Sequence, residues 1–88
     1  MFEQTITVIN KLGIHARPSS LIVQTAMKFN SGITLIKDGA SADAKSIMSV
    51  MMLAAEMGSK VQIKASGPDE KDAVAAIALL FEKKFNEE

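Results

Sequence analysis

The stretch KVQIKAS, from Lys60 to Ser66, alternates between polar and apolar residues without a break. A period of two is typical of a strand that buries one face and exposes the other. The following GPDE, residues 67–70, places a proline and two acidic residues where a helix would begin. The segment therefore predicts a half-exposed strand over residues 60–66 that leads directly into a final helix.

The first half of the chain divides into shorter segments of the same two kinds. Alternation predicts a strand over residues 5–9, and Gly13 interrupts it. Apolar residues at helical spacing then predict a helix over residues 16–29, which the NSG that follows should stop. β-branched residues predict a strand over 33–36, and the tight turn at Asp38-Gly39 should return a third strand over about 41–44.

The second half adds two helices around the strand at 60–66. Ser46 can cap a short helix from residue 47 to about residue 55, with Gly58 beyond its end. Lys83 and Lys84 should lie at the C-terminal end of the last helix, where positive charge is favourable. Its expected buried stripe consists of Val74, Ile77, Phe81 and Phe85. The order β-α-β-β-α-β-α implies an α+β fold, an antiparallel sheet with helices packed on one face.

Composition limits the class of protein. The 88 residues suffice for one domain, spanning 1–88, and ten basic residues balance ten acidic ones, which argues against general nucleic-acid binding. The absence of cysteine excludes disulfides and thiolate metal sites. The first ten residues lack the basic and apolar regions of a signal peptide, and the longest apolar run, 47–55, is too short to span a bilayer. We expect a soluble, cytoplasmic domain that does not insert into a membrane.

The stretch GIHARP, residues 13–18, contains the single histidine, His15, and the single arginine, Arg17. His15 should lie at or near the N-cap of the first helix, where Pro18 is tolerated and backbone N–H groups have no intrahelical partner. Such an end attracts anions and disfavours a second positive charge, so the imidazole should tend to be neutral and nucleophilic. Arg17 adds a planar donor fork suited to phosphate oxygens. The pair points to a histidine that accepts a phosphoryl group.

Other interpretations of this histidine stay open on the residues alone. A lone histidine at a helix start is more often a cap or a surface residue than a nucleophile. A metal site would lack a second histidine or cysteine to share the ion. A Ser–His pair with Ser19 or Ser20 would lack a nearby carboxylate to orient the imidazole. We therefore expect no metal and no cofactor.

Three stretches together resemble one protein family. LGIHARPSSLIVQTA, residues 12–26, resembles the active-site signature of HPr, the histidine-containing phosphocarriers of the bacterial phosphoenolpyruvate-dependent sugar phosphotransferase system. KDGASADAKSIMSVMML, residues 37–53, resembles the family's hairpin and second helix, and ASGPDEKDAVAAI, residues 65–77, its last strand-to-helix junction. The resemblance implies an open-faced β-sandwich, with a four-stranded antiparallel sheet in the order 1-4-2-3 covered on one face by three helices.

The resemblance also implies a function. Phospho-enzyme I would phosphorylate Nδ1 of His15, and the group would pass to sugar-specific enzyme IIA proteins, so the chain would be a carrier rather than a stand-alone enzyme. Arg17 and Ala16 would stabilise the phosphate. Two alternatives remain: a carrier of a nitrogen-linked regulatory phosphorelay, and a regulatory interaction module that transfers nothing.

A regulatory site and a docking surface follow from the second helix. Ser46 is an ordinary N-cap, but KSIM, residues 45–48, also resembles the form of the family that HPr kinase/phosphorylase phosphorylates on this serine. Helical spacing cannot bury all the methionines at 48, 51 and 52, and exposed methionine adapts to several partners. The expected docking residues, on a monomer, are Ser20, Ile47, Met48 and Met51.

The chain departs from the family pattern at three positions. Leu12 stands where many members have a small polar residue, and Ser49 replaces a glycine common beside the regulatory serine. Ala54 replaces a frequent glycine near the end of the second helix, which predicts that this helix runs further.

Overall fold

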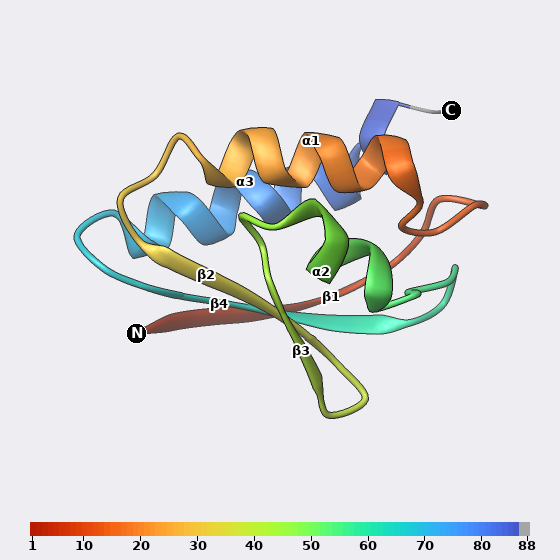
Figure 1. The fold of residues 1–88 in the computed structure, drawn as a ribbon, viewed down its shortest axis with the longest axis horizontal. Coiled ribbons are helices and arrows are strands. Elements are labelled where there is room, and N and C mark those ends of the chain that lie inside the picture. Colours follow the sequence, from red (N-terminus) through yellow and green to blue (C-terminus); the bar gives the residue numbers. More distant parts are fainter. Residues whose placement is uncertain (87–88) are drawn as a thin grey trace.

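A computed structural model describes residues 1–86, which form a four-stranded antiparallel sheet with helices on one side (Figure 1). The strands are β1 (Phe2–Thr7), β2 (Gly32–Lys37), β3 (Ala40–Asp43) and β4 (Lys60–Ser66). The helices are α1 (Ala16–Ala26), α2 (Ile47–Met52) and α3 (Glu70–Glu82), and a short 3₁₀ turn, η1 (Lys84–Asn86), follows. The strand order is β1-β4-β2-β3, so both the element order and the sheet order expected from the sequence are confirmed.

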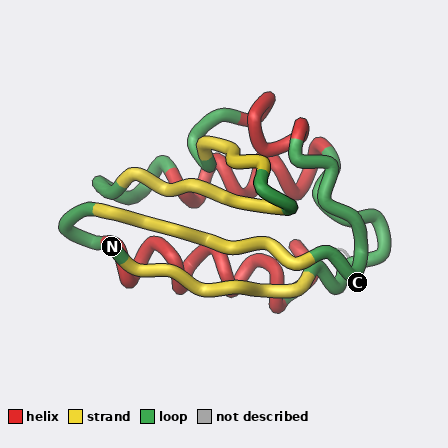
Figure 2. Tube along the Cα trace, turned by 90° about the horizontal axis from the view of Figure 1, so that it is seen from below, coloured by secondary structure: helices red, strands yellow, loops and turns green. Residues whose placement is uncertain are grey.

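The strand β4 has the bounds that its alternation predicts and lies inside the sheet, between β1 and β2. Val61, Ile63 and Ala65 are buried on the face that carries the helices. Gln62 and Lys64 lie on the other face, which is open, and Figure 2 shows the strands in front of the helices from that side. The polar half of the alternation is therefore the open face, and the apolar half is the floor of the core.

The core fills the space between the sheet and the three helices. Its apolar residues come from every element of the sheet and from each helix, which explains why so short a chain forms one continuous core. The largest fully buried side chains are Phe81, Phe85, Ile22, Leu35, Ile63, Ile77, Val8, Val50, Val61, Val74, Asn10 and Pro18.

Two early elements differ from the predicted bounds. β1 begins at Phe2 and ends at Thr7, although Val8 still pairs through its N–H and carbonyl with Ser59 and Gly58, both at 2.8 Å. α1 ends at Ala26 instead of residue 29, because the N–H groups of Lys28 and Phe29 donate to carbonyls three residues back rather than four. Phe29, the last residue of the predicted helix, nevertheless packs against the core from this tighter turn.

The prediction that α2 extends to about residue 55 is wrong, because the helix ends at Met52. Ala54 adopts φ 52°, the left-handed conformation that usually requires glycine at a helix end. The physical reason is the next residue: Ala55 is buried, and its carbonyl accepts a hydrogen bond from the Ile14 N–H at 2.9 Å. The chain must therefore leave the helix at this point, whether or not residue 54 is glycine.

The end of α3 differs in the same way. The helix ends at Glu82 with Lys83 as its C-cap, so Lys84 and Phe85 lie beyond it, in η1. Phe85 is fully buried as predicted, but it reaches the core through residues with positive φ rather than through a continued helix. Its ring packs edge-on against Phe81, with centroids 4.8 Å apart. Within residues 1–86, no helix has the length and apolar character needed to cross a bilayer.

Candidate functional site

A tight turn leads from β1 to the first helix. The side-chain amide of the buried Asn10 donates to the Gly13 carbonyl at 2.7 Å, and the Gly13 N–H donates back to the Asn10 carbonyl at 3.2 Å. Gly13 has φ 65°, which other residues adopt only at a cost. The turn therefore depends on both residues, and it fixes the direction in which the chain enters α1.

The same turn packs on the segment that follows α2. A Cβ at Gly13 would overlap the carbonyl oxygen of Ala55 and lie 2.9 Å from Cα of Glu56. The next residue, Ile14, is held by the hydrogen bond from its N–H to Ala55. The segment after α2 thus supports the residues just before His15, a contact that the sequence did not reveal because no pattern joins two such distant loops.

His15 is the N-cap of α1, as predicted. Its backbone is extended (φ −114°, ψ −163°), its carbonyl accepts from the Ser19 N–H at 2.9 Å, and its half-buried side chain makes no capping hydrogen bond. The N–H groups of Ala16 and Arg17 precede this first helical bond, and Pro18 has none. Ala16 and Arg17 are both exposed, and the first turn of α1 contains no acidic side chain. An imidazole, a guanidinium and two helix-start N–H groups therefore lie close together in the chain.

Ser46 is the N-cap of α2, as predicted. Its Oγ accepts from the Ser49 N–H at 3.4 Å, and its carbonyl accepts from the Val50 N–H at 3.0 Å. The side chain is half-buried, so the hydroxyl remains accessible at the helix start. The capping role is thus a structural observation, independent of any modification.

The apolar residues of α2 divide between the core and the surface. Val50 and Leu53 are buried, so the helix presents the remaining apolar side chains to solvent. We call the exposed set the apolar patch: Ile47, Met48, Met51 and Met52, exposed by 41%, 67%, 41% and 79%. The expectation that some methionines face outward is confirmed, and all three of this helix do.

The docking residues named from the sequence include three members of the apolar patch but omit Met52. They also omit Leu12, which is 73% exposed in the turn before His15. Ser20, the remaining docking candidate, lies half-buried on α1, where its Oγ accepts from Gln24 at 3.1 Å. α1 and α2 pack against each other, which places Ser20 and the apolar patch on adjoining helices (Figure 1). Leucines and methionines can be named as docking candidates from the sequence alone, but the sequence does not show which of their side chains face solvent.

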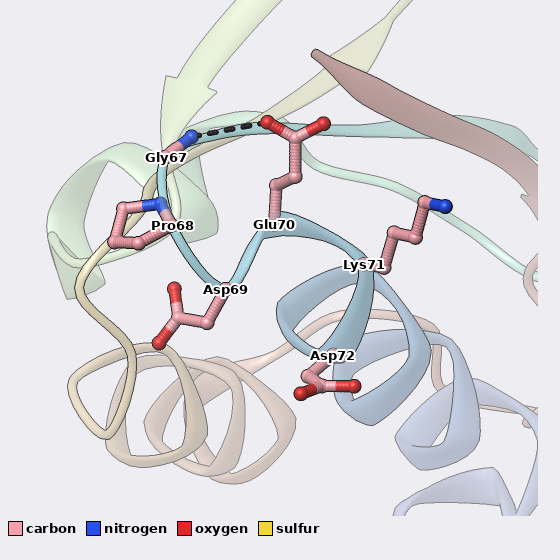
Figure 3. A pocket seen from close by; sticks show the side chains of 6 residues that line it. All are labelled: Gly67, Pro68, Asp69, Glu70, Lys71 and Asp72. Carbon is pink, nitrogen blue, oxygen red and sulfur yellow. Dashed lines mark hydrogen bonds between the residues drawn. The ribbon is translucent and has the colours of Figure 1, made fainter.

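The start of α3 forms a small pocket of a different character (Figure 3). The Asp69 carboxylate accepts hydrogen bonds from the Ser31 Oγ and, at 2.9 Å, from the Asn30 N–H, and these bonds hold the pKa of Asp69 below its usual value. Glu70 accepts from the Gly67 N–H at 3.2 Å and pairs with the Met1 amino group at 3.1 Å, which lowers the pKa of Glu70. Two of the three carboxylates that line this pocket, those of Asp69 and Glu70, therefore already join parts of the chain.

Among the residues that the structure describes, no three histidine, cysteine, aspartate or glutamate side chains gather into a group that could hold an ion.

Comparison with known proteins agrees with this arrangement. A family described as the PTS HPr component phosphorylation site matches residues 2–83. The phosphocarrier protein HPr of Treponema pallidum (strain Nichols) is 49% identical over 88 residues, covering 100% of both chains. A crystal structure of HPr-C-His from Thermoanaerobacter tengcongensis has a TM-score of 0.95 and 49% identity, covering 100% of this chain and 99% of that one. An HPr dimer from the same organism has a TM-score of 0.79 at 48% identity, covering 99% and 100%.

Proposed function

This chain belongs to the HPr family of phosphocarrier proteins, and from that premise we propose that His15 accepts a phosphoryl group from phospho-enzyme I and passes it to sugar-specific enzyme IIA proteins. The observation that carries the proposal is the start of α1, where the N-cap is a histidine, an exposed arginine lies two residues further on, and the first turn has no acid. A carrier of this kind would act in the cytoplasm.

The proposed step transfers one phosphoryl group between two proteins. The imidazole nitrogen Nδ1 of His15 forms a bond to phosphorus while the bond between phosphorus and enzyme I breaks, so no other reactant is needed. The N–H groups of Ala16 and Arg17 and the guanidinium of Arg17 then stabilise the negative charge.

The strength of that stabilisation suits a carrier. A helix N-terminus contributes about 0.3–2 kcal/mol to a bound anion, and one charged hydrogen bond contributes about 1.5–3 kcal/mol. Such modest terms allow the phosphoryl group to be held and then released to the next protein, whereas a strongly bound phosphate could not be passed on.

The test is incubation with enzyme I and labelled phosphoenolpyruvate, followed by mapping of the label. One phosphoryl group should appear, stable in base and lost in acid, as expected for a bond between phosphorus and an imidazole nitrogen. His15→Ala should abolish it, and an unchanged melting temperature would show that the fold is intact. Label that persists in His15→Ala would overturn the proposal.

Arg17 provides a second test of the same site. Its side chain is exposed, so Arg17→Ala should leave the melting temperature nearly unchanged while slowing transfer. Arg17→Lys should restore transfer only in part, because lysine lacks the planar donor fork. Full activity of Arg17→Ala would mean that the helix start alone suffices.

Ser46 is proposed as a regulatory phosphorylation site for HPr kinase/phosphorylase. Ser46→Asp keeps a capping oxygen and adds charge beside Ile47 and Met48 of the apolar patch, which must lose water when enzyme I docks. The KM for this chain in the enzyme I reaction should therefore rise, with less effect on the maximal rate, and the rise should persist at moderate salt. An unchanged KM would leave Ser46 as a cap and nothing more.

The same assay separates the alternatives. A carrier of a nitrogen-linked phosphorelay would accept the phosphoryl group from a different enzyme I, whereas a regulatory module that transfers nothing would stay unlabelled with either. The expected monomer stays a prediction, because several similar structures are described as dimers, one of them an HPr dimer. Sedimentation of the purified chain would measure the oligomeric state.

A further inference from the structure

Lys37 is the last residue of β2, and its position on the strand is unusual for a charged side chain. Ile33 and Leu35 are buried on the helix side of β2, and alternation places Lys37 on that same side. A lysine there can cover apolar surface with its stem, but its ammonium group needs an acceptor. Lys37 finds two: its Nζ donates to the carbonyls of Leu53 at 3.3 Å and Ala54 at 3.2 Å.

These two carbonyls lie directly after α2, since Leu53 is the C-cap of the helix and Ala54 is the next residue. The C-terminal end of a helix is the negative end of its dipole. The last turn of α2 contains no basic residue of its own. Lys37 therefore places a cation from the sheet beside this helix end and binds the two carbonyls that follow it.

The segment that Lys37 holds is also the segment that supports His15. Ala54, one of the two acceptors, has φ 52°, a conformation that alanine adopts only at an energetic cost and that needs support from its surroundings. The next residue, Ala55, accepts the hydrogen bond of the Ile14 N–H at 2.9 Å, and Gly13 packs against it. Short contacts thus connect Lys37 to the residue immediately before His15.

We propose that Lys37 is a positioning residue for His15. By binding the carbonyls of Leu53 and Ala54, Lys37 holds the end of α2 against Gly13 and Ile14, which we call the 13–14 turn, and so fixes the start of α1. The effect on phosphoryl transfer rests on the proposed function of His15. The effect on the Ile14 hydrogen bond does not, and it can be measured without any partner protein.

The first measurement is amide hydrogen exchange of Ile14 in Lys37→Met, compared with exchange of Ile63 in β4. Methionine keeps the apolar stem but removes the donors, so exchange of Ile14 relative to Ile63 should accelerate about two- to fivefold. A loss of global stability would accelerate both amides and leave their ratio unchanged. Lys37→Arg should restore the ratio.

Lys45→Met is the matched control for this exchange experiment. The Lys45 Nζ also donates to a backbone carbonyl, that of Phe29 at 3.0 Å, beyond the end of α1. Lys45→Met removes a similar hydrogen bond, but that bond does not involve residues 53–55. The Ile14 to Ile63 ratio should therefore stay at the wild-type value, and acceleration as large as in Lys37→Met would overturn the proposal.

The second measurement is the enzyme I reaction. Lys37→Met should lower the maximal rate and leave KM unchanged, because the apolar patch survives while the start of α1 is held less firmly. Ala54→Gly should shrink this loss, since glycine adopts the same φ without strain and needs less support.

Two results would overturn the positioning role: an unchanged exchange ratio in Lys37→Met, or an accelerated Ile14 amide with an unchanged maximal rate. A wild-type chain that accepts no phosphoryl group would instead contradict the proposed function. In that case the exchange ratio alone would decide. Faster exchange of Ile14 relative to Ile63 in Lys37→Met would mean that Lys37 holds the 13–14 turn in place, and an unchanged ratio would overturn that role.

Discussion

The start of α1 and the start of α3 are both positive helix ends, and they are completed in opposite ways. At α3, Asp69 and Glu70 place two carboxylates at the helix start and bind them to neighbouring groups of the chain (Figure 3). At α1, the first turn has no acidic residue, and the chain places His15 and Arg17 there instead. The chain's own carboxylates thus neutralise the helix dipole at α3, whereas the first turn of α1 has none, and it is there that we propose the phosphoryl group binds.

Both helix starts also depend on a glycine that the neighbouring backbone touches. A Cβ at Gly13 would collide with Ala55 and Glu56, and a Cβ at Gly67 would lie 2.6–2.9 Å from atoms of Ser31. Both glycines have positive φ, 65° and 152°. Each helix start therefore follows a glycine that has positive φ and no room for a Cβ, and the two starts differ in their charged groups.

The largest predicted effect is on stability, in Gly13→Ala and Gly67→Ala. Each should lower the free energy of unfolding by about 2–5 kcal/mol, the sum of about 1–2 for positive φ and about 1–3 for the close contact. Urea denaturation measures this loss. Gly39→Ala is the control, because Gly39 has φ 82° but nothing within 4 Å of a Cβ, so its cost should be that of conformation alone.

Transfer assays on the same variants then separate the two helix starts. At a temperature where both variants are folded, Gly13→Ala should transfer phosphoryl groups more slowly than Gly67→Ala, because it displaces the turn before His15. Equal rates would show that the geometry of this turn is irrelevant to the reaction, and the functional half of the comparison would be wrong.

The second prediction converts the start of α1 into one like that of α3. Ala16→Glu adds a carboxylate to the first turn, and its repulsion of an incoming phosphoryl group, about 1.4–3 kcal/mol, should slow transfer about tenfold to a hundredfold. The free energy of unfolding should stay constant or rise by up to about 1 kcal/mol, because the acid suits the helix dipole. Enzyme I kinetics and thermal melting measure the two effects.

Ala16→Gln is the matched variant, with the same shape and no charge. The rate difference between the glutamate and glutamine variants isolates electrostatics from crowding at the site. If the two variants slow transfer equally, a negative charge at the start of α1 has no effect on the transfer rate.

The periodic pattern of the sequence predicted which helices and strands form, whereas several of their ends differ, and at α2 a contact between distant segments sets the end. The strand at residues 60–66 was predicted with its bounds, because alternation and flanking turn residues define both ends. The end of α2 was not, because the bond between Ile14 and Ala55 overrides a helical pattern that continues past Met52. Local propensity carries no information on such a bond.

The candidate site divides in the same way. His15 and Arg17 could be named because each residue type is unique in the chain, and the N-cap position of His15 follows from local signals. The link from Lys37 to the end of α2 could not, since a lysine before a turn is ordinary in sequence. The orientation of Met52 likewise depends on how α2 rotates against the core.

The third prediction concerns acid stability at the start of α3. The pKa of Asp69 is lowered by its hydrogen bonds from Ser31 and Asn30, so this carboxylate contributes stability above its unfolded pKa, which is about 4. That contribution disappears as the pH falls through the lowered value. Asp69→Asn should therefore melt below wild type at pH 7, and the gap should close well below about pH 4.

Asp72→Asn is the control for the acid experiment. Asp72 is exposed in the first turn of the same helix, so its removal changes the charge near the dipole without touching the bonds to Asn30 and Ser31. Its melting temperature should follow that of wild type more closely at every pH. A gap for Asp69→Asn that does not depend on pH would show that the charge of this carboxylate is irrelevant to the fold.

The smallest expected effect is at α2, whose start lies between the two extremes because a neutral hydroxyl caps it. Ser46→Ala should cost about 0.5 kcal/mol, the low end for a lost cap, since Oγ lies 3.4 Å from the Ser49 N–H. Ser49→Ala removes a hydroxyl from the same helix without touching the cap oxygen and should cost less in the same urea titration.

Transfer to His15 should hardly change in Ser46→Ala, because the neutral apolar patch remains. A cost near 2 kcal/mol, or slower transfer, would mean that the hydroxyl does more than complete the helix. Of the three helix starts, this one alone is capped by a hydroxyl, and phosphorylation of that serine would turn a neutral end into an anionic end like that of α3.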